Sequence, residues 1–173
     1  MEQCLFCKIA SGEIPSKIIY DSKDVMAFLD IKPANPGHVL VIPKEHFEIL
    51  PTLPEDLNSS LLQVVKIITQ AQIEALGAQG VNVLQNNGEL AGQAVPHVHI
   101  HVIPRFKDDK IVINWTPTGL KHEQFDEIQK RLISKAKELA SGEKETSKQV
   151  EETPNEPEVK GKKKLQRVKA RLP

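Results

Sequence analysis

The chain has 173 residues with 23 basic and 23 acidic side chains, so its net charge points to no charged partner. That length suits one domain with an appendage and is enough to bury a hydrophobic core. No apolar stretch reaches the ~20 residues of a membrane span, and the N-terminus lacks the basic and apolar regions of a signal peptide, so we expect a cytoplasmic protein.

The first motif in chain order is Cys4-x-x-Cys7, which contains the two cysteines of the sequence. In a reducing compartment this spacing favours metal or redox chemistry over a structural disulfide. The pair lies too early in the chain for a thioredoxin-type motif, which follows a strand of a βαβ unit. We therefore expect half of a zinc site, completed by two ligands from elsewhere in the chain.

Short apolar runs and turn signals follow. Strands are predicted over 17–20, 25–31 and 38–43, with a loop rich in proline and glycine at 32–37. A helix is predicted over 54–76, because its apolar residues recur with the spacing of one amphipathic face and Gly77 stands where a helix ends. A strand over 81–86 then leads into a glycine-containing loop at 87–93.

The segment 96–105 alternates strictly between polar and apolar residues, and its polar positions include His97, His99 and His101. Side chains of a β-strand point alternately to its two faces, so a strand here places the three imidazoles on one face. Such a triplet suits an imidazole nucleophile, a zinc site or a merely structural set of histidines. The triplet alone does not decide among these roles.

The C-terminal part begins with a second amphipathic helix, predicted from about residue 123 to 139. Its apolar side comprises Phe125, Ile128, Leu132, Ile133 and Ala136. Residues 141–173 are predicted to be a charged, disordered tail, because so few apolar residues cannot offset the entropy of ordering. Its basic block at 160–171 also suits a weak, non-specific contact with nucleic acid.

Several separated motifs together resemble the histidine triad (HIT) family of nucleotide hydrolases and transferases. They are the His97-x-His99-x-His101 triplet, the segments 36–44, 28–31 and 85–88, and Gly92-Gln93. The similarity is strongest over 3–115, within an expected domain of residues 1–140. It implies an α+β fold, with a five-stranded antiparallel sheet, one long helix and a C-terminal helix, in a homodimer.

The resemblance also implies a reaction. In the family, the middle histidine, here His99, attacks the α-phosphorus of an AMP-linked substrate, and water resolves the nucleotidyl-histidine. The substrate is an adenosine phosphoramidate, an acyl-adenylate or a dinucleoside polyphosphate. By the same resemblance the carbonyl of His97 orients His99, His101 donates to the phosphate or carries a proton, and His38 supports the cluster.

Further matched positions would bind the nucleotide. Asp30 corresponds to the residue that accepts hydrogen bonds from the ribose, and Asn86 and Gln93 to residues that bond phosphate oxygens. Ala94 departs from the pattern, because the Hint branch of the family has a serine there that helps to protonate a leaving amine. Phosphoramidates should suffer more from this departure than dinucleoside polyphosphates, which have better leaving groups.

The resemblance to microbial zinc-containing members assigns the remaining ligands. The expected structural zinc is bound by Cys4, Cys7, His46 and His97, a set that closes a tetrahedral site and leaves no position for catalysis. No catalytic metal is therefore expected on the triad, and His122 is interpreted as a surface residue. Two other functions stay open: a zinc-dependent nucleic-acid-binding module that uses the basic tail, and a metallohydrolase with zinc on the triad.

Overall fold

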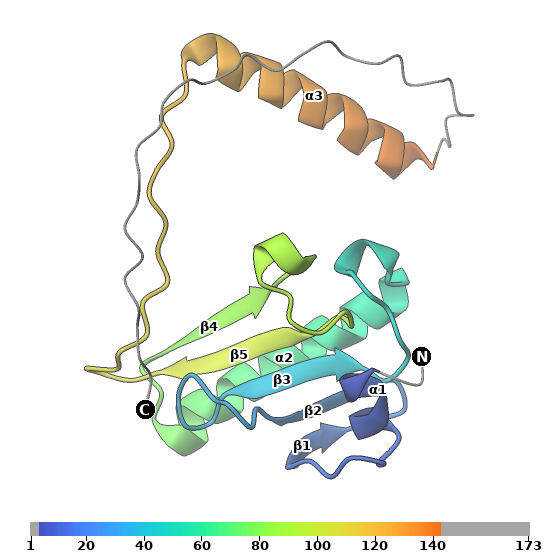
Figure 1. The fold of residues 1–173 in the computed structure, drawn as a ribbon, viewed down its shortest axis with the longest axis vertical. Coiled ribbons are helices and arrows are strands. Elements are labelled where there is room, and N and C mark those ends of the chain that lie inside the picture. Colours follow the sequence, from blue (N-terminus) through green and yellow to red (C-terminus); the bar gives the residue numbers. More distant parts are fainter. Residues whose placement is uncertain (1–3, 143–173) are drawn as a thin grey trace, which may run out of the picture. The chain divides into compact units, whose positions relative to one another are not determined.

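The computed structural model describes residues 4–142, and the chain divides into two compact units between Asn114 and Trp115. The first unit is an antiparallel sheet with a helix on each face (Figure 1). Its strands are β1 (Ile18–Asp21), β2 (Val25–Leu29), β3 (Val39–Pro43), β4 (Gly80–Gln85) and β5 (Ile100–Arg105), in the spatial order β1-β2-β3-β5-β4. The predicted α+β fold is confirmed.

Strands β2 and β3 are buried on both faces, and their alternate side chains serve two cores. The side chains that pack with the long helix α2 (Glu55–Leu76) are Val25, Ala27, Val39 and Val41. Those that pack with the short helix α1 (Leu5–Ala10) are Met26, Phe28, Leu40 and Ile42. Figure 1 shows α1 in front of the sheet and α2 behind it. The sheet therefore has an α1 face and an α2 face.

Helix α2 confirms the prediction for 54–76, with small differences at its start. Pro54 is the N-cap, and the acidic Glu55 and Asp56 lie in the first turn, where negative charge is stabilised by the helix dipole. Gly77 ends the helix in the left-handed conformation with φ 67°, and the N–H of the next residue, Ala78, donates to the carbonyl of Gln72 at 3.2 Å. One-turn 3₁₀ helices, η1 (Leu50–Thr52) and η2 (Glu89–Ala91), interrupt the loops on either side of α2 and β4.

The prediction that one strand carries all three triad histidines is wrong, because β5 begins only at Ile100. The chain bends ahead of it: the N–H of His97 donates to the carbonyl of Val95 at 2.8 Å, and the N–H of Val98 donates to that of Phe47 at 2.6 Å. The predicted alternation of faces holds nevertheless. Val98, Ile100 and Val102 are buried in the core on the α2 face.

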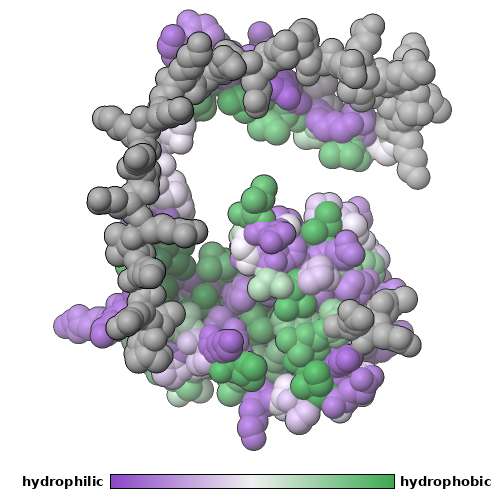
Figure 2. Space-filling model, in the orientation of Figure 1, coloured by the Kyte–Doolittle hydropathy of each residue, from purple (hydrophilic) through white to green (hydrophobic). Residues whose placement is uncertain are grey.

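The second unit contains helix α3 (His122–Ser141), close to the predicted 123–139. No residue of α3 is buried, and its apolar residues gather on one side, visible as the green band along the helix in Figure 2. Among residues 4–142, no helix combines the length and the hydrophobicity that crossing a membrane requires. The predicted tail lies almost entirely outside the described residues, and the domain boundary at 140 stays a prediction.

Candidate functional site

Four histidines converge on the α1 face of the sheet, namely His38, His97, His99 and His101. Leu40 of β3 faces α1 and is the cross-strand partner of His101, so His101 projects from the same face. His38 lies two residues before Leu40 and shares that face. The ring of His99 packs between those of His101 and Phe6, at centroid distances of 5.0 and 5.1 Å. Helix α1 thus forms one wall of the histidine cluster through Phe6.

The ring of His99 is oriented by the main chain. Its Nδ1 lies 2.7 Å from the carbonyl oxygen of His97, which only a protonated Nδ1 can approach as a donor. In the ring with a single proton, the lone pair is therefore on Nε2. Only 4% of His99 is exposed. Nε2 of His99 has no hydrogen-bond partner among residues 4–142. The side-chain nitrogens and oxygens there that are both buried and unpartnered belong to Ser16 and Gln72. Because Nε2 of His99 is unpartnered but not among them, it is not fully buried and reaches solvent.

His101 and His38 form a hydrogen-bonded pair beside His99. Nε2 of His38 and Nδ1 of His101 are 3.0 Å apart, and the ring centroids are 5.1 Å apart. Burial, and next the neighbouring His99 and His38, lowers the pKa of His101 to about 4. Burial also lowers the pKa of His38, although Asp30 opposes the shift. Both rings are therefore neutral at neutral pH.

Asp30 stands next to this pair, in the segment between β2 and β3. Its Oδ1 accepts from the N–H of Lys32 at 2.8 Å, and its Oδ2 is 3.5 Å from Nδ1 of His38. The carboxylate is partly exposed, at 18% of its side chain. It is thus held by the chain and open to solvent, as a group that receives hydroxyls must be.

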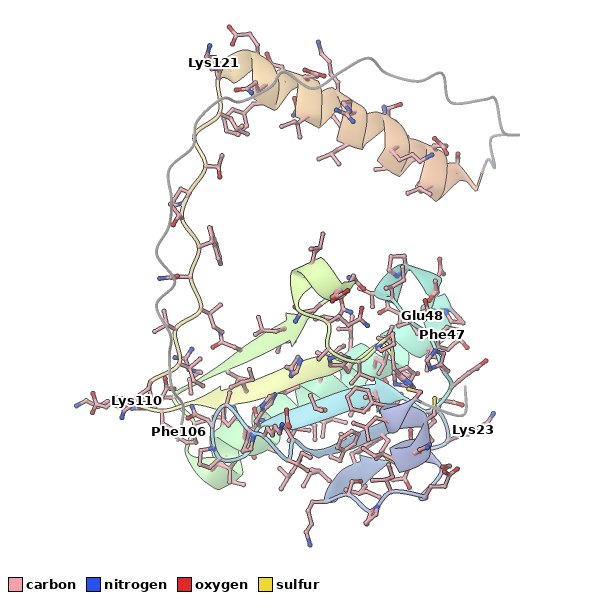
Figure 3. The ribbon with its side chains drawn as sticks, in the orientation of Figure 1. Lys23, Phe47, Glu48, Phe106, Lys110 and Lys121 are labelled. Carbon is pink, nitrogen blue, oxygen red and sulfur yellow. The ribbon has the colours of Figure 1, made fainter. Side chains whose placement is uncertain are left out.

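Gln93 and Asn86 lie in the loops ahead of β5. Gln93 is buried; its Oε1 accepts from the N–H of Gly88 at 2.7 Å, and its Nε2 donates to the carbonyl of Glu48 at 2.7 Å and lies 3.5 Å from that of His97. Figure 3 labels Glu48 in the segment between β3 and α2. The amide of Asn86 lies 3.6 Å from where a Cβ of Gly92 would stand. The structure brings Gln93 to the carbonyl that orients His99, and both of its amide atoms already have main-chain partners.

A second cluster occupies the start of α1 and the segment after β3. The four ligand atoms of Cys4, Cys7, His46 and His97 lie within 4.8 Å of one another. Nδ1 of His97 is 3.4 Å from Sγ of Cys4, 3.6 Å from Sγ of Cys7 and 3.3 Å from Nδ1 of His46. Zinc with bonds of about 2.3 Å to sulfur and about 2.0 Å to nitrogen holds tetrahedral ligands about 3.3–3.8 Å apart. The donor set and its spacing fit a zinc ion.

The ring of His97 connects the two clusters. Its Nε2 donates to the carbonyl of Pro43 at 2.9 Å, which leaves the Nδ1 lone pair directed at the cysteines. Burial lowers the pKa of His97, which keeps the ring in the neutral form that binds metals. Burial raises the pKa of the Cys7 thiol, so a metal must displace its proton on binding. Within residues 4–142, a second group of side chains is also close enough together to hold a metal: Asp30, His38 and His101. His99 belongs to neither group.

Sequence reasoning missed a polar network beside the cluster. The carboxylate of Asp109 receives both the Nε and the Nη2 of Arg105 at 2.7 Å, together with Nδ2 of Asn35 at 3.0 Å. The hydrogen bonds from Arg105, and next those from the main chain, hold the pKa of Asp109 well below its usual range. Only the spacing of four between Arg105 and Asp109 was visible in the sequence, and Asn35 lies 74 positions away from Asp109.

Comparison with known proteins places these features in context. Residues 11–108 match the HIT domain family. A HIT-like protein of Methanocaldococcus jannaschii is 43% identical over 75% of this chain and 98% of its own. The adenosine 5′-monophosphoramidase of Schizosaccharomyces pombe is 38% identical over 78% of this chain and 98% of its own. A zinc-bound histidine triad family protein of Mycobacterium smegmatis superposes with a TM-score of 0.62 at 34% identity, over 82% of this chain and 99% of that chain.

Proposed function

We propose, given that the chain belongs to the HIT domain family, that it is a hydrolase or transferase of AMP-linked nucleotides that works through a nucleotidyl-histidine on His99. The observation that carries this proposal is the hydrogen bond from Nδ1 of His99 to the carbonyl of His97. Whenever the ring carries a single proton, this bond puts that proton on Nδ1 and leaves the solvent-facing Nε2 as the nucleophilic atom of a fixed ring.

The reaction has two displacements at the α-phosphorus. In the first, the lone pair of Nε2 forms an N–P bond while the bond from phosphorus to the leaving group breaks, and the leaving group takes up a proton. In the second, a water oxygen bonds to phosphorus and releases one proton to solvent, the N–P bond breaks, and the products are AMP and a neutral His99. The carbonyl of His97 stabilises the positive charge that the ring carries in the intermediate.

The neighbouring residues serve the nucleotide in this proposal. His101 donates a hydrogen bond or a proton at the phosphate, and His38 supports it from the opposite side of the ring. The carboxylate of Asp30 accepts from the ribose hydroxyls. Gln93 and Asn86 line the phosphate pocket. Gln93 also holds the loop and the carbonyl of His97 in place.

The Cys4, Cys7, His46 and His97 cluster would hold a structural zinc ion. Such an ion, when bound, ties α1 to the segment that carries the nucleophile. Its four protein ligands leave it no open position, so the steps at phosphorus belong to the histidines. The relative named as zinc-bound supports this assignment.

A homodimer is also part of the proposal. Leu62 and Ile73 share one side of α2 and are 54% and 48% exposed. Val83 of the edge strand β4 is 47% exposed and is the cross-strand partner of Val102, so it lies on the α2 face of the sheet. These side chains of the helix and of the edge strand are apolar and exposed, and a second copy that covers them would remove both from water.

The experiment is a panel of AMP conjugates assayed with the wild-type protein and with His99→Ala. We expect turnover by the wild type and its loss, by at least ~100-fold, in the variant. Ala94 leads us to expect slower turnover of phosphoramidates than of diadenosine polyphosphates. Mass spectrometry of the quenched wild-type reaction should find one AMP group on His99.

His122→Ala is the matched control, since His122 is an exposed histidine at the start of α3. It should retain wild-type rates, and circular dichroism should show that both variants are folded. Equal activity in His99→Ala, or AMP attached to another residue, contradicts the proposal.

A further inference from the structure

Two groups compete for Nδ1 of His38. The main-chain N–H of Ala34 points at Nδ1 from 3.2 Å and forms a hydrogen bond with it. Oδ2 of Asp30 lies 3.5 Å from the same atom, beyond the usual range for a side-chain hydrogen bond. Because an N–H donor cannot bond to a nitrogen that carries a proton, the Ala34 contact requires a bare Nδ1. The proton of neutral His38 is therefore on Nε2.

The tautomer of His38 determines that of His101. The Nε2–H of His38 donates to Nδ1 of His101 over 3.0 Å, so Nδ1 of His101 is also bare and its proton is on Nε2. Among residues 4–142, Nε2 of His101 has no hydrogen-bond partner and is not a buried atom. The chain Ala34 to His38 to His101 thus ends in an N–H that faces solvent beside His99.

The loop that carries Ala34 is held from two sides. Nδ2 of Asn35 donates to the carbonyl of Pro104 at 2.9 Å and to Asp109 at 3.0 Å, and the carbonyl of Asn35 accepts from the N–H of His38 at 3.0 Å. Asp109 is itself fixed by Arg105 and by the N–H groups of Phe106 and Ile111, in the turn after β5 where Figure 3 labels Phe106.

From the side of α2, the buried Gln72 donates to the carbonyl of Gly37 at 2.9 Å. Gly37 has φ 91°, and a Cβ there would come within 2.4 Å of Leu76. The loop is therefore packed tightly against the end of the helix. The N–H of Ala34 has little freedom to leave His38.

We propose that Asn35 and Asp109 are positioning residues that fix the tautomers of His38 and His101, so that His101 presents an Nε2–H to the substrate phosphate. The phosphate as the receiver of this N–H rests on the proposed function, whereas the tautomers belong to the free protein. If Asn35 releases the loop, Asp30 becomes the better partner of Nδ1 of His38. The proton of His38 then moves to Nδ1, its Nε2 accepts from Nδ1–H of His101, and Nε2 of His101 is left without a proton.

The test reads the tautomers directly. Two-dimensional ¹⁵N–¹H spectra of the histidine rings separate protonated from bare nitrogens, and at about pH 7.5 both rings are neutral. The wild type should show protonated Nε2 and bare Nδ1 at His38 and at His101. Asn35→Asp keeps the size of the side chain but sets a carboxylate against Asp109 and the carbonyl of Pro104, so it should reverse both rings. If Asn35→Asp does not fold, Asn35→Ala and Asp109→Ala remove the hydrogen bond between the two side chains without adding a charge, and both should show the same reversed tautomers.

Asn82→Ala is the matched control. It removes the hydrogen bond that Nη1 of Arg105 donates to Oδ1 of Asn82 at 2.6 Å, but leaves the hydrogen bond between Asn35 and Asp109. It should retain the wild-type tautomers. A proton on Nδ1 of His38 in the wild type overturns the inference, and so do wild-type tautomers in both Asn35→Asp and Asn35→Ala.

Kinetics supply a second, separable reading. If the panel of AMP conjugates is turned over, Asn35→Asp should lower kcat by ~10-fold to ~100-fold, because a general acid or donor is lost, and leave KM within about twofold. An unchanged kcat with reversed tautomers overturns the role at the phosphate. If the wild type turns over nothing, the proposed function fails while the spectra still decide the tautomers.

Discussion

At the scale of single residues, the four clustered imidazoles differ in their partners rather than in their chemistry. The carbonyl of His97 accepts a hydrogen bond from Nδ1–H of His99, and the carbonyl of Pro43 accepts one from Nε2–H of His97. The N–H of Ala34 donates to Nδ1 of His38, which is therefore bare. One side-chain type therefore provides a nucleophile, a metal ligand and a donor within a small volume.

The resemblance predicted that the carbonyl of His97 orients His99, and the structure has this hydrogen bond. The sequence did not predict the main-chain partners of His97 and His38. Alternation in 96–105 and the distant His38 indicated a cluster, since side-chain spacing along strands is regular. Main-chain partners such as the carbonyl of Pro43, 54 positions from His97, depend on tertiary packing. No local pattern encodes them.

The burial of His101 predicts a loss of stability in acid. Its pKa is about 4 in the folded protein, mainly because burial disfavours the charged ring, whereas the unfolded chain has a value of about 6.5. Between these values the unfolded chain binds more protons, so the free energy of unfolding decreases as the pH falls from about 6.5 to about 4. His101 contributes at most about 3 kcal/mol to this decrease.

Urea unfolding between about pH 7 and about pH 4 measures the effect. His101→Gln should show a shallower decline than the wild type, and the difference isolates His101 from His38, His97 and the metal ligands. His122→Ala should follow the wild-type curve. A decline as steep in His101→Gln as in the wild type contradicts the prediction.

At the scale of elements, α1 is the helix that sequence reasoning did not predict. It has six residues, too few for a clear periodic pattern and too few for a stable helix in isolation. It forms because Phe6 and Ile9 are buried against the α1 face of the sheet, and Phe6 also contacts the rings of His97 and His99. Strands β2 and β3 and helix α2 were predictable because each is long and apolar enough for its pattern to be read.

The placement of Cys4 and Cys7 at α1 predicts one zinc ion per chain. Metal bound to the folded state alone stabilises it by about 4 kcal/mol when free zinc is 1,000-fold above its dissociation constant. Elemental analysis of the purified wild type should therefore find one equivalent of zinc. Cys7→Ser should lose it, unfold at lower urea, and show no further destabilisation with a chelator.

His122→Ala should keep the full equivalent, because His122 lies outside the cluster. A full zinc equivalent in Cys7→Ser would show that the metal is bound elsewhere. Two equivalents in the wild type would instead favour a metal on Asp30, His38 and His101.

At the scale of the whole molecule, the exposed apolar side of α2 predicts a dimer in solution. Light scattering after gel filtration should give twice the chain mass of 19.3 kDa. Ile73→Glu places a charge in the expected interface and should weaken the dimer at least ~10-fold.

Ile67→Glu is its matched control, since Ile67 is 50% exposed on the opposite flank of α2. It should remain dimeric. A monomeric wild type, or a dimer equally stable in both variants, contradicts the prediction.

The overall architecture was accessible from sequence because its separated motifs resemble one family in order and spacing. The sheet order and the packing of the Asn35 loop against Asp109 and Leu76 were not, because they join positions far apart in the chain. The alternative of nucleic-acid binding depends on the basic block at 160–171, which lies outside the described residues, and stays a prediction.

The partners of His38 and His97 are peptide groups, and this shapes what evolution can alter. Any amino acid at residue 43 supplies a carbonyl, and any except proline at residue 34 supplies an N–H. Neither hydrogen bond therefore depends on which side chain stands at residue 34 or 43, although Pro43 itself is buried. The chemistry of the cluster thus depends on the course of the main chain at these two positions rather than on their side chains.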